Sequence, residues 1–419
     1  MQVAKIPVIA YLANEFPAVV EPYVGEEIAE FRRRGVTVVA CSARFPADAA
    51  SSKACDEVLY LQSVRVSQIL RAAWFALQNF RVLLSFIRRI MRQGHETAGQ
   101  RMRALLHTAL GAYFAVLLQP RGVKHIHVHH GYFGAWIAMV AARLLGIPFT
   151  MTLHGSDLLR DGAYLDTKLA ECSLCVTVSE FNRCYILEHF PGIPANKISV
   201  QRLGVSVGSR QLQEIAGGDS QLTLLAVGRL HAVKDHAFLL RACRRLKDRG
   251  KELTCMIAGE GSERPSLERM ILDLGLRDDV QLLGHVPHER LEAYCAAADI
   301  VTLTSKSEGI PVALMEAMSY GKVVLAPAIT GVPELVIDGE TGFLYRAGDL
   351  DDFLARVEMI CDSLPELGRL RKAARQHILE NFNQQKNVAG FCDLLLARFH
   401  PDVRYSYANS VLQQVQLSV

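Results

Sequence analysis

The feature that most constrains the fold of this chain is an alternation of short apolar runs with stretches of helical periodicity, repeated along most of its length. Such an alternation is typical of βαβ units, in which parallel strands are joined by crossover helices. In the first half we expect helices such as 24–34 and 134–145, between strands at 7–12, 36–41, 125–129, 149–153 and 174–178. In the second half we expect strands at 222–227, 254–258, 280–283, 300–303 and 323–326. The sequence therefore predicts an α/β fold with two successive doubly wound halves.

The two halves are separated by a segment in which this periodicity lapses. Residues 208–220 read GSRQLQEIAGGDS, which is rich in glycine and polar residues, and a new apolar run follows directly. A chain of 419 residues is also too long for one ordinary core. We therefore expect Rossmann-like domains at 1–207 and 221–385, a linker between them, and a C-terminal helix and tail at 386–419 that packs back on the first domain.

Composition and charge exclude several classes of protein. A net charge of +3 and a pI near 8.3 are too mild for a nucleic-acid binder. No apolar run reaches the length of a membrane-spanning helix, since the best stretch, 104–118, is short and contains His107. The N-terminus lacks the features of a signal peptide, so we expect a cytoplasmic protein whose ten cysteines are reduced. The CxxC at Cys172 and Cys175 has no second pair, and a zinc site there is not favoured.

Ligands of open α/β sheets bind beyond the carboxyl ends of the strands, so the loops that follow each strand are the places to search. The strand at 222–227 is followed by GRLHAVKDH, which contains Arg229 and Lys234. These two cations suit a diphosphate, because arginine can bind two phosphate oxygens while lysine adds a point charge. The alternative is a solvated helix start. The loop lacks GxGxxG, which removes the usual support for a nicotinamide cofactor.

The segment TSKSEGIPVALMEAMSYGK, at 304–322, carries the strongest local signal. It follows a buried strand and places Pro311 where a helix would begin. The helix expected at 311–320 directs its free N–H groups toward Gly309, which makes a seat for a diphosphate. A capped helix with no ligand is the alternative.

Two carboxylates, Glu308 and Glu316, stand eight positions apart in this segment. Eight helical residues rise about 12 Å, which exceeds the roughly 5–9.5 Å that glycoside hydrolysis requires between its carboxyl groups. A carboxylate can instead accept both hydroxyls of a ribose, and this role suits Glu316.

Weaker signals follow the next two strands. In AGEGSER, Gly259 and Gly261 flank Glu260 and permit a tight turn close to a ligand. In LLGHVPHERL, His285 and Val286 offer backbone groups and an apolar edge to a nucleobase. A plain strand-to-helix turn explains each segment equally well.

Histidines mark two strands of the first half. His125, His127 and His129 alternate with apolar residues and therefore share one face of their strand. A zinc site is not preferred, because no carboxylate or cysteine is close in sequence; we expect His129 or His130 at a strand end near an acceptor. His154 follows the strand at 149–153, where a core histidine is the alternative to a role at the site.

The E-x7-E motif in SEGIPVALMEAM, with VGRL and a lysine upstream and GVPELVIDGETGFL downstream, resembles the family-4 retaining glycosyltransferases of the GT-B fold. The first half resembles their bacterial exopolysaccharide branch, of the colanic-acid type, in LANEFPAVVEPYVGEEIAEFRRRG, in HIHVHHGYFGAWIAMVAARLLGIPFTMTLHGSDL and in VTVSEFNRCYI. It departs from many relatives by carrying Asn14-Glu15-Phe16-Pro17 where they have a Gly-Gly pair.

This resemblance implies a role for each candidate residue, with the acceptor on the first domain and the nucleotide sugar on the second. The catalytic set would be Glu308, His154, Arg229 and Lys234. The donor-binding set would be Glu316, Gly309, Ile310, Pro311, Leu314, Glu260, Gly261, His285 and Val286. The acceptor side would include Asn14, His129, His130 and Asp157.

The resemblance also implies a reaction. A sugar would pass from a nucleotide diphosphate, with UDP favoured over GDP-mannose, to a saccharide acceptor without a metal or other cofactor, because fixed cations stabilise the leaving diphosphate. The alternatives are a sugar-nucleotide epimerase or phosphorylase on the same fold, or an inactive scaffold that binds nucleotide sugars. An epimerase acts without an acceptor, and an inactive scaffold releases no nucleotide.

Residues 61–124 form the one strongly biased stretch, with ten cations and a single acid, Glu96. Aromatic and aliphatic residues alternate with these cations at helical spacing. Such a helix can lie on an anionic membrane, so we expect peripheral binding to the inner leaflet and a lipid-linked acceptor. The alternative is that these helices pack on the first domain with their arginines solvated.

Overall fold

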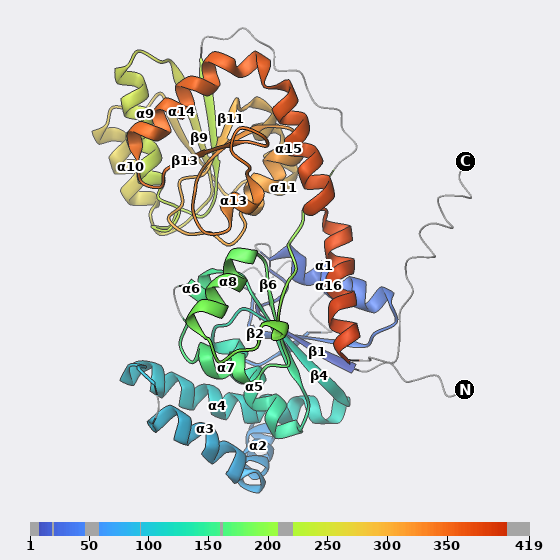
Figure 1. Cartoon of the computed structure of the whole chain (residues 1–419). Helices are drawn as coiled ribbons and strands as arrows, with labels where there is room; N and C mark the ends of the chain where they lie inside the picture. Colours follow the sequence, from blue (N-terminus) through green and yellow to red (C-terminus); the bar gives the residue numbers. More distant parts are fainter. Residues whose placement is uncertain are drawn as a thin grey trace, which may run out of the picture. The chain divides into compact units, whose positions relative to one another are not determined.

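The computed structural model describes residues 8–18, 21–46, 58–92, 94–159, 162–207 and 221–399. The linker predicted at 208–220 and the tail beyond residue 399 lie outside the described residues. The chain forms two compact units (Figure 1). The first unit takes its described residues from Met1–Leu153, Gly162–Val176 and Val388–Val419, and the second takes them from His154–Asp161 and Thr177–Asn387.

A parallel sheet forms the centre of the first unit. Its strand order is β3-β2-β1-β4-β5-β6-β7, with β1 paired in parallel to both β2 and β4. The strands are β1 Val8–Glu15, β2 Val38–Arg44, β3 Leu59–Tyr60, β4 Val123–His129, β5 Phe149–Leu153, β6 Leu174–Thr177 and β7 Ile198–Val200.

Helices cover both faces of this sheet, as expected for strands that are apolar on both sides. Helices α1 (Pro22–Arg33) and α16 (Gln384–Phe399) pack on one face, where Phe31 and Phe391 join a core with Tyr11. Helix α5 (Phe133–Leu145) packs on the other face. Gly146, in the left-handed conformation at φ 65°, ends α5 at the predicted place.

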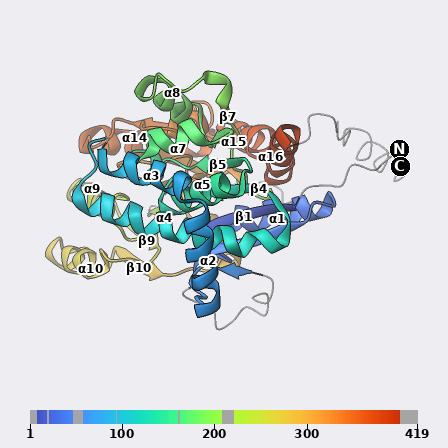
Figure 2. The ribbon, with the colours of Figure 1, turned by 90° about the horizontal axis from the view of Figure 1, so that it is seen from below.

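Three further helices lie outside α5: α2 (Val66–Gln78), α3 (Phe80–Arg92) and α4 (Ala98–Leu118). Helix α4 packs directly against α5, and α2 and α3 pack against α4 (Figures 1 and 2). A capping box between Thr97 and Gln100 begins α4. In the described part of the chain, no helix combines the length and apolar character that a membrane span requires.

The second unit is built on a sheet ordered β10-β9-β8-β11-β12-β13, again with parallel pairing. Its strands are β8 Leu222–Val227, β9 Leu253–Ala258, β10 Val280–Gly284, β11 Ile300–Thr302, β12 Val323–Pro327 and β13 Phe343–Tyr345. Its helices are α6 Ser156–Leu159, α8 Glu180–His189, α9 His236–Asp248, α10 Arg264–Asp273, α11 His288–Ala297, α12 Val312–Ser319, α13 Val332–Leu335, α14 Leu350–Ser363 and α15 Gly368–Asn381. Helix α7 (Leu165–Glu171) belongs to the first unit.

Two apolar cores, one on each face, hold this second sheet. Leu224 contributes to the core under α9 and α14, while its neighbour Leu225 contributes to the core under α12 and α15. The predicted fold class, α/β with two Rossmann-like domains, is therefore confirmed. The loops that leave the carboxyl ends of these strands carry most of the predicted site residues.

Candidate active site

The loop after β8 and the loop before α12 meet in the second unit. Lys234 Nζ lies 2.5 Å from Glu308 Oε1, although the two residues are 74 positions apart. The stem of Lys234 extends over Gly228, where a Cβ would lie 3.5 Å from Cδ and Cε of the lysine. The side chains of Lys234 and Glu308 are only 19% and 12% exposed. Two residues predicted to be catalytic, both from loops that follow the carboxyl ends of strands, are thus in direct contact.

Glu308 is held in place by its neighbours. Ser305 Oγ donates to Glu308 Oε1 at 2.5 Å, so the same carboxylate oxygen accepts from a hydroxyl and an ammonium group. Thr330 Oγ1 donates to the Glu308 carbonyl at 2.6 Å and lies 3.2 Å from the Glu308 backbone N–H. Ser305 and Thr330 were not predicted as site residues. Ser305 lies within the segment at 304–322, and Thr330 directly precedes the motif GVPELVIDGETGFL.

Arg229 is exposed at the start of the β8–α9 loop. Within the described ranges, its guanidinium forms no ion pair or hydrogen bond, so its five donors face solvent. The loop backbone is fixed instead, because the buried ring of His236 contacts the Arg229 carbonyl through Nε2 at 3.3 Å. Burial lowers the pKa of His236, which favours the neutral ring, and the tautomer that carries its proton on Nε2 can donate to this carbonyl.

The loop before α12 packs against two other loops at Gly309. A Cβ on Gly309 would overlap the carbonyl oxygen of His154, and a Cβ on Gly331 would overlap the carbonyl oxygen of Gly309. We expected a phosphate to approach Gly309 closely. In the structure, the backbone of His154 already occupies the space beside this glycine.

Helix α12 begins at Val312, with Pro311 as its N-cap, close to the predicted start. Ile310 and Leu314 are buried in the core beneath this helix, so their side chains support the loop from below. Glu316 lies on α12 and is half-buried.

His154 follows β5 directly, as the strand pattern predicts. Asp157 is fully buried, and its Oδ1 accepts the backbone N–H groups of His154 at 3.0 Å and Gly155 at 2.9 Å. Asp157, which we expected on the acceptor side, therefore holds the backbone of the loop that carries His154.

The loop after β9 lies beside the β8 loop. A Cβ on Gly259 would overlap the carbonyl oxygen of Gly228, and one on Gly261 would overlap that of Leu230. Glu260 pairs with Arg264 at 2.7 Å. In the next loop, His285 is exposed and Val286 is half-buried.

The histidines predicted on one face of β4 form a buried network in the first unit. His125 Nε2 and His127 Nδ1 both contact Thr150 Oγ1, at 2.9 and 2.8 Å. His129 is fully buried, with Nε2 2.7 Å from Tyr11 Oη and 2.9 Å from Glu27 Oε2.

The two remaining acceptor-side candidates lie nearer the surface of the first unit. His130, at φ 68°, contacts Glu21 through Nε2 at 2.8 Å. Asn14 is half-buried at the end of β1, and its Oδ1 would lie 3.3 Å from a Cβ on Gly134 at the start of α5.

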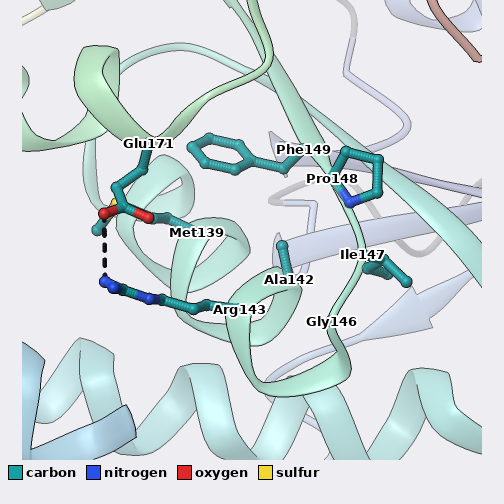
Figure 3. A pocket seen from close by; sticks show the side chains of 8 residues that line it. All are labelled: Met139, Ala142, Arg143, Gly146, Ile147, Pro148, Phe149 and Glu171. Atoms are coloured by element: carbon teal, nitrogen blue, oxygen red, sulfur yellow. Dashed lines mark hydrogen bonds and ion pairs between the residues drawn. The ribbon is translucent and has the colours of Figure 1, made fainter.

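A cavity of about 260 Å³ lies elsewhere in the first unit (Figure 3). Its rim carries the ion pair between Arg143 and Glu171, with an N–O distance of 3.2 Å, and Phe149 forms part of its wall. Phe149 begins β5, so this cavity is at the amino end of the strand, opposite to His154. None of the predicted site residues lines it.

Two family models match successive parts of the chain. The model described as Glycosyltransferase Family 4 matches residues 20–208, and the model described as Glycosyl transferases group 1 matches residues 210–377. The amylovoran biosynthesis glycosyltransferase AmsK of Erwinia amylovora is 30% identical over 288 residues, which cover 66% of this chain and 70% of that relative. The putative colanic acid biosynthesis glycosyltransferase WcaL of Escherichia coli (strain K12) is 32% identical over 201 residues, covering 46% of this chain and 50% of WcaL.

Solved structures share the fold. Sucrose-phosphate synthase from Thermosynechococcus elongatus superposes with a TM-score of 0.73 at 16% identity, covering 94% of this chain and 100% of that one. Anabaena HepE in complex with UDP and glucose superposes with a TM-score of 0.69 at 17% identity, covering 93% of this chain and 100% of HepE. The two family models match successive parts of the chain, and the alignment with AmsK covers 70% of that relative. The chain therefore belongs to glycosyltransferase family 4.

Proposed function

We propose that this protein is a retaining glycosyltransferase that uses a nucleotide-diphosphate sugar, with a UDP-sugar favoured over GDP-mannose. The observation that carries the proposal is the contact between Lys234 and Glu308, with the solvent-facing guanidinium of Arg229 on the same loop as the lysine. Retention is proposed from membership of the family. UDP is favoured because the HepE structure contains UDP and glucose.

Sugar transfer breaks the bond between the anomeric carbon and a diphosphate oxygen; the acceptor hydroxyl oxygen forms the new bond, and its proton passes to the departing diphosphate. Negative charge then develops on the leaving diphosphate. Arg229, Lys234 and the N-terminus of α12 are positive groups that can stabilise this charge without a metal ion. Because Glu308 already orients Lys234, the ammonium group needs little reorganisation when the diphosphate arrives. The Glu308 carboxylate remains beside the sugar, where it can stabilise positive charge on the ring.

The donor proposal is tested by measuring nucleotide release from a panel of UDP-sugars and GDP-mannose, with and without saccharide acceptors. We expect Arg229→Ala to lower kcat/KM roughly 10- to 150-fold, because a charge-assisted hydrogen bond is worth about 1.5–3 kcal/mol. Arg245→Ala removes an exposed cation from the last turn of α9 and is the matched control. Unchanged turnover in both Arg229→Ala and Lys234→Ala would refute the site.

We further propose that the acceptor is a lipid-linked saccharide in exopolysaccharide or cell-surface glycan synthesis. Support comes from relatives named for amylovoran and colanic acid biosynthesis, and from the exposed surface of α2 and α3. On α3, Phe80, Leu84, Ile87 and Met91 form one exposed apolar stripe, at intervals of four, three and four residues.

Helix α2 carries a second set of exposed apolar side chains. Val66, Leu70, Trp74 and Leu77 are all exposed, and Trp74 and Leu77 retain 62% and 64% of their accessible area. We call the two stripes together the α2–α3 surface. Exposed apolar stripes of this kind mark sites where a protein binds a membrane or another protein.

Positive charge lies beside the apolar stripe. Arg81, Arg88 and Arg92 are exposed on α3, each one position after a member of the stripe. Arginines next to exposed apolar side chains complement an anionic lipid surface, and each adds about 1 kcal/mol to binding. Two predicted cations are used differently: Arg89 binds Asp166 at 2.9 Å, and Arg101 donates to backbone carbonyls including that of Met91.

Cosedimentation with liposomes tests the membrane proposal. We expect the protein to bind vesicles that contain anionic lipid at low salt. The combined change of Arg81, Arg88 and Arg92 to Glu should abolish binding, while the same changes at the exposed Arg241, Arg245 and Arg269 of the second unit should not. Native protein that stays in the supernatant, or that buries this surface by dimerising in the absence of lipid, would overturn the proposal.

A further inference from the structure

Asn182 is a fully buried polar residue whose side-chain amide has no use within the fold. It lies in the first turn of α8 and is 0% exposed. Among the residues that the structure describes, neither its Oδ1 nor its Nδ2 has a hydrogen-bond partner. The helix itself does not need this amide, because Ser179 Oγ already accepts the Asn182 backbone N–H at 3.1 Å.

Buried amides in proteins are normally paired, because removing them from water without a partner is costly. The half-buried Asn387 of the second unit follows this rule. Asn387 Nδ2 donates to the carbonyl groups of Leu203 and Asn381, both at 3.0 Å. In Asn182 both the donor, Nδ2, and the acceptor, Oδ1, lack a partner. A further polar group is needed to pair them.

The missing group lies next to the loops that form the candidate active site. Asn182 Nδ2 is 3.8 Å from the point where a Cβ on Gly155 would stand. That same point lies 3.2 Å from the Cα of Gly309, so the amide, the His154–Gly155 turn and the loop before α12 are close neighbours. Gly155 has φ 120°, a conformation that disfavours any side chain, so no Cβ stands between the amide and the backbone of Gly309.

We propose that Asn182 binds the transferred sugar, donating a hydrogen bond through Nδ2 to one hydroxyl and accepting one through Oδ1 from another. This inference rests on the proposed function. The chemistry of the amide selects the ligand: a phosphate only accepts hydrogen bonds and would leave Oδ1 unpaired, whereas neighbouring sugar hydroxyls can both donate and accept. Asn182 is thereby a specificity-determining residue for the donor sugar rather than for its nucleotide.

The test compares Asn182→Leu with the native enzyme in three measurements. In the ligand-free protein we expect Tm to be unchanged or higher, because an unpaired buried amide has been replaced by an apolar side chain of similar size. For the donor sugar we expect kcat/KM to fall roughly 5- to 150-fold, from the loss of one or two hydrogen bonds. Binding of the free nucleoside diphosphate, measured by calorimetry, should not change.

Deoxy donors then locate the contact. The native enzyme should discriminate against a donor that lacks one ring hydroxyl, and Asn182→Leu should lose that discrimination. Asn387→Leu is the matched control, and it should lower Tm without changing donor selectivity. A lower Tm for Asn182→Leu with unchanged kcat/KM would overturn the proposal, because it would show that the amide serves the fold. Loss of nucleotide binding in Arg229→Ala, with native selectivity in Asn182→Leu, would refute this inference and leave the proposed function standing.

Discussion

Replacement of Gly309 by alanine separates two explanations for the glycine in the loop before α12. The first explanation is that a diphosphate must approach the backbone closely. The second is that the protein's own backbone fills the space. A Cβ at Gly309 would overlap the His154 carbonyl oxygen and lie 3.2 Å from its carbonyl carbon and 3.4 Å from Val178 Cγ2. A backbone carbonyl cannot rotate away as the end of a flexible side chain can, so the loops must separate.

The expected size of the effect follows from this geometry. The backbone at Gly309 has no left-handed φ, so the cost comes from the clash alone. Overpacking of this kind costs about 1–3 kcal/mol. For a unit of this size each 1 kcal/mol lowers Tm by about 2–4 °C, which gives a decrease of about 2–12 °C. Glu308 precedes Gly309 directly, and a displacement of its carboxylate by about 1 Å is expected to lower kcat/KM by about 10²-fold.

Thermal unfolding without ligand and donor turnover together decide between the two explanations. Gly192→Ala is the matched control, because that residue is exposed, has no heavy atom within 4 Å of its ideal Cβ, and has no left-handed φ. Its Tm should stay close to the native value. If Gly309→Ala keeps the native Tm and loses only donor affinity, the backbone-packing argument is wrong and the ligand explanation is correct.

Three further predictions concern single side chains. If Glu316 binds the ribose, the native enzyme should penalise a 2′-deoxy donor, and Glu316→Ala should show much less penalty; equal discrimination in both would place the contact elsewhere. Asp157→Ala leaves the backbone N–H groups of His154 and Gly155 without this acceptor, so Tm and kcat/KM should both fall, with a smaller loss in Asp157→Asn. Burial lowers the pKa of His125 to about 3, so stability should fall as the pH decreases from 6.5 toward 3, when only the unfolded chain gains this proton. In His125→Leu, urea midpoints should depend less steeply on pH over that range, and an unchanged slope would contradict the assignment.

The strands could be predicted because parallel strands with helices on both faces are continuous apolar runs. The predicted ranges of β5 and β8 coincide with those in the structure. The strands at Leu59–Tyr60, Ile198–Val200 and Phe343–Tyr345 were missed, because two or three residues establish no period; the equally short β11 was predicted because it lies in a longer apolar run. Their strand character comes from pairing at the sheet, which is a long-range contact.

The rule that ligands bind beyond the carboxyl ends of parallel strands also singled out Lys234 and Glu308, which the structure brings into contact. It could not assign a reason to each glycine. A glycine beside a ligand and a glycine beside a crossing backbone look the same in a sequence, and at Gly259 and Gly309 the structure shows a crossing backbone. Asn182 was missed for a related reason, because nothing in its local sequence reveals that its amide is buried without a partner.

The basic stretch shows where helical periodicity stops being informative. The sequence predicts an amphipathic pattern but leaves open which apolar residues face inward. In the structure Phe86 and Ile90 pack inside, while Ile87 and Met91 remain outside. Arg89 belongs to the same pattern, but it forms an ion pair with Asp166, which is 77 positions away. The choice depends on the neighbours that tertiary packing supplies.

The histidines of β4 show how tertiary packing can bury a polar strand face. Alternation correctly places three rings on one face of the strand, but β4 is flanked by β1 and β5, and its histidine face lies under α1 and α16. Phe391 of α16 contacts both His127 and His129, and Glu27 of α1 accepts from the Tyr11 hydroxyl beside them. A polar strand face can be buried only when the covering elements bring partners, and here those partners come from both ends of the chain. The residues of α16 from Val388 onward are therefore an integral part of the first unit's core, and truncation before them would leave this polar network uncovered.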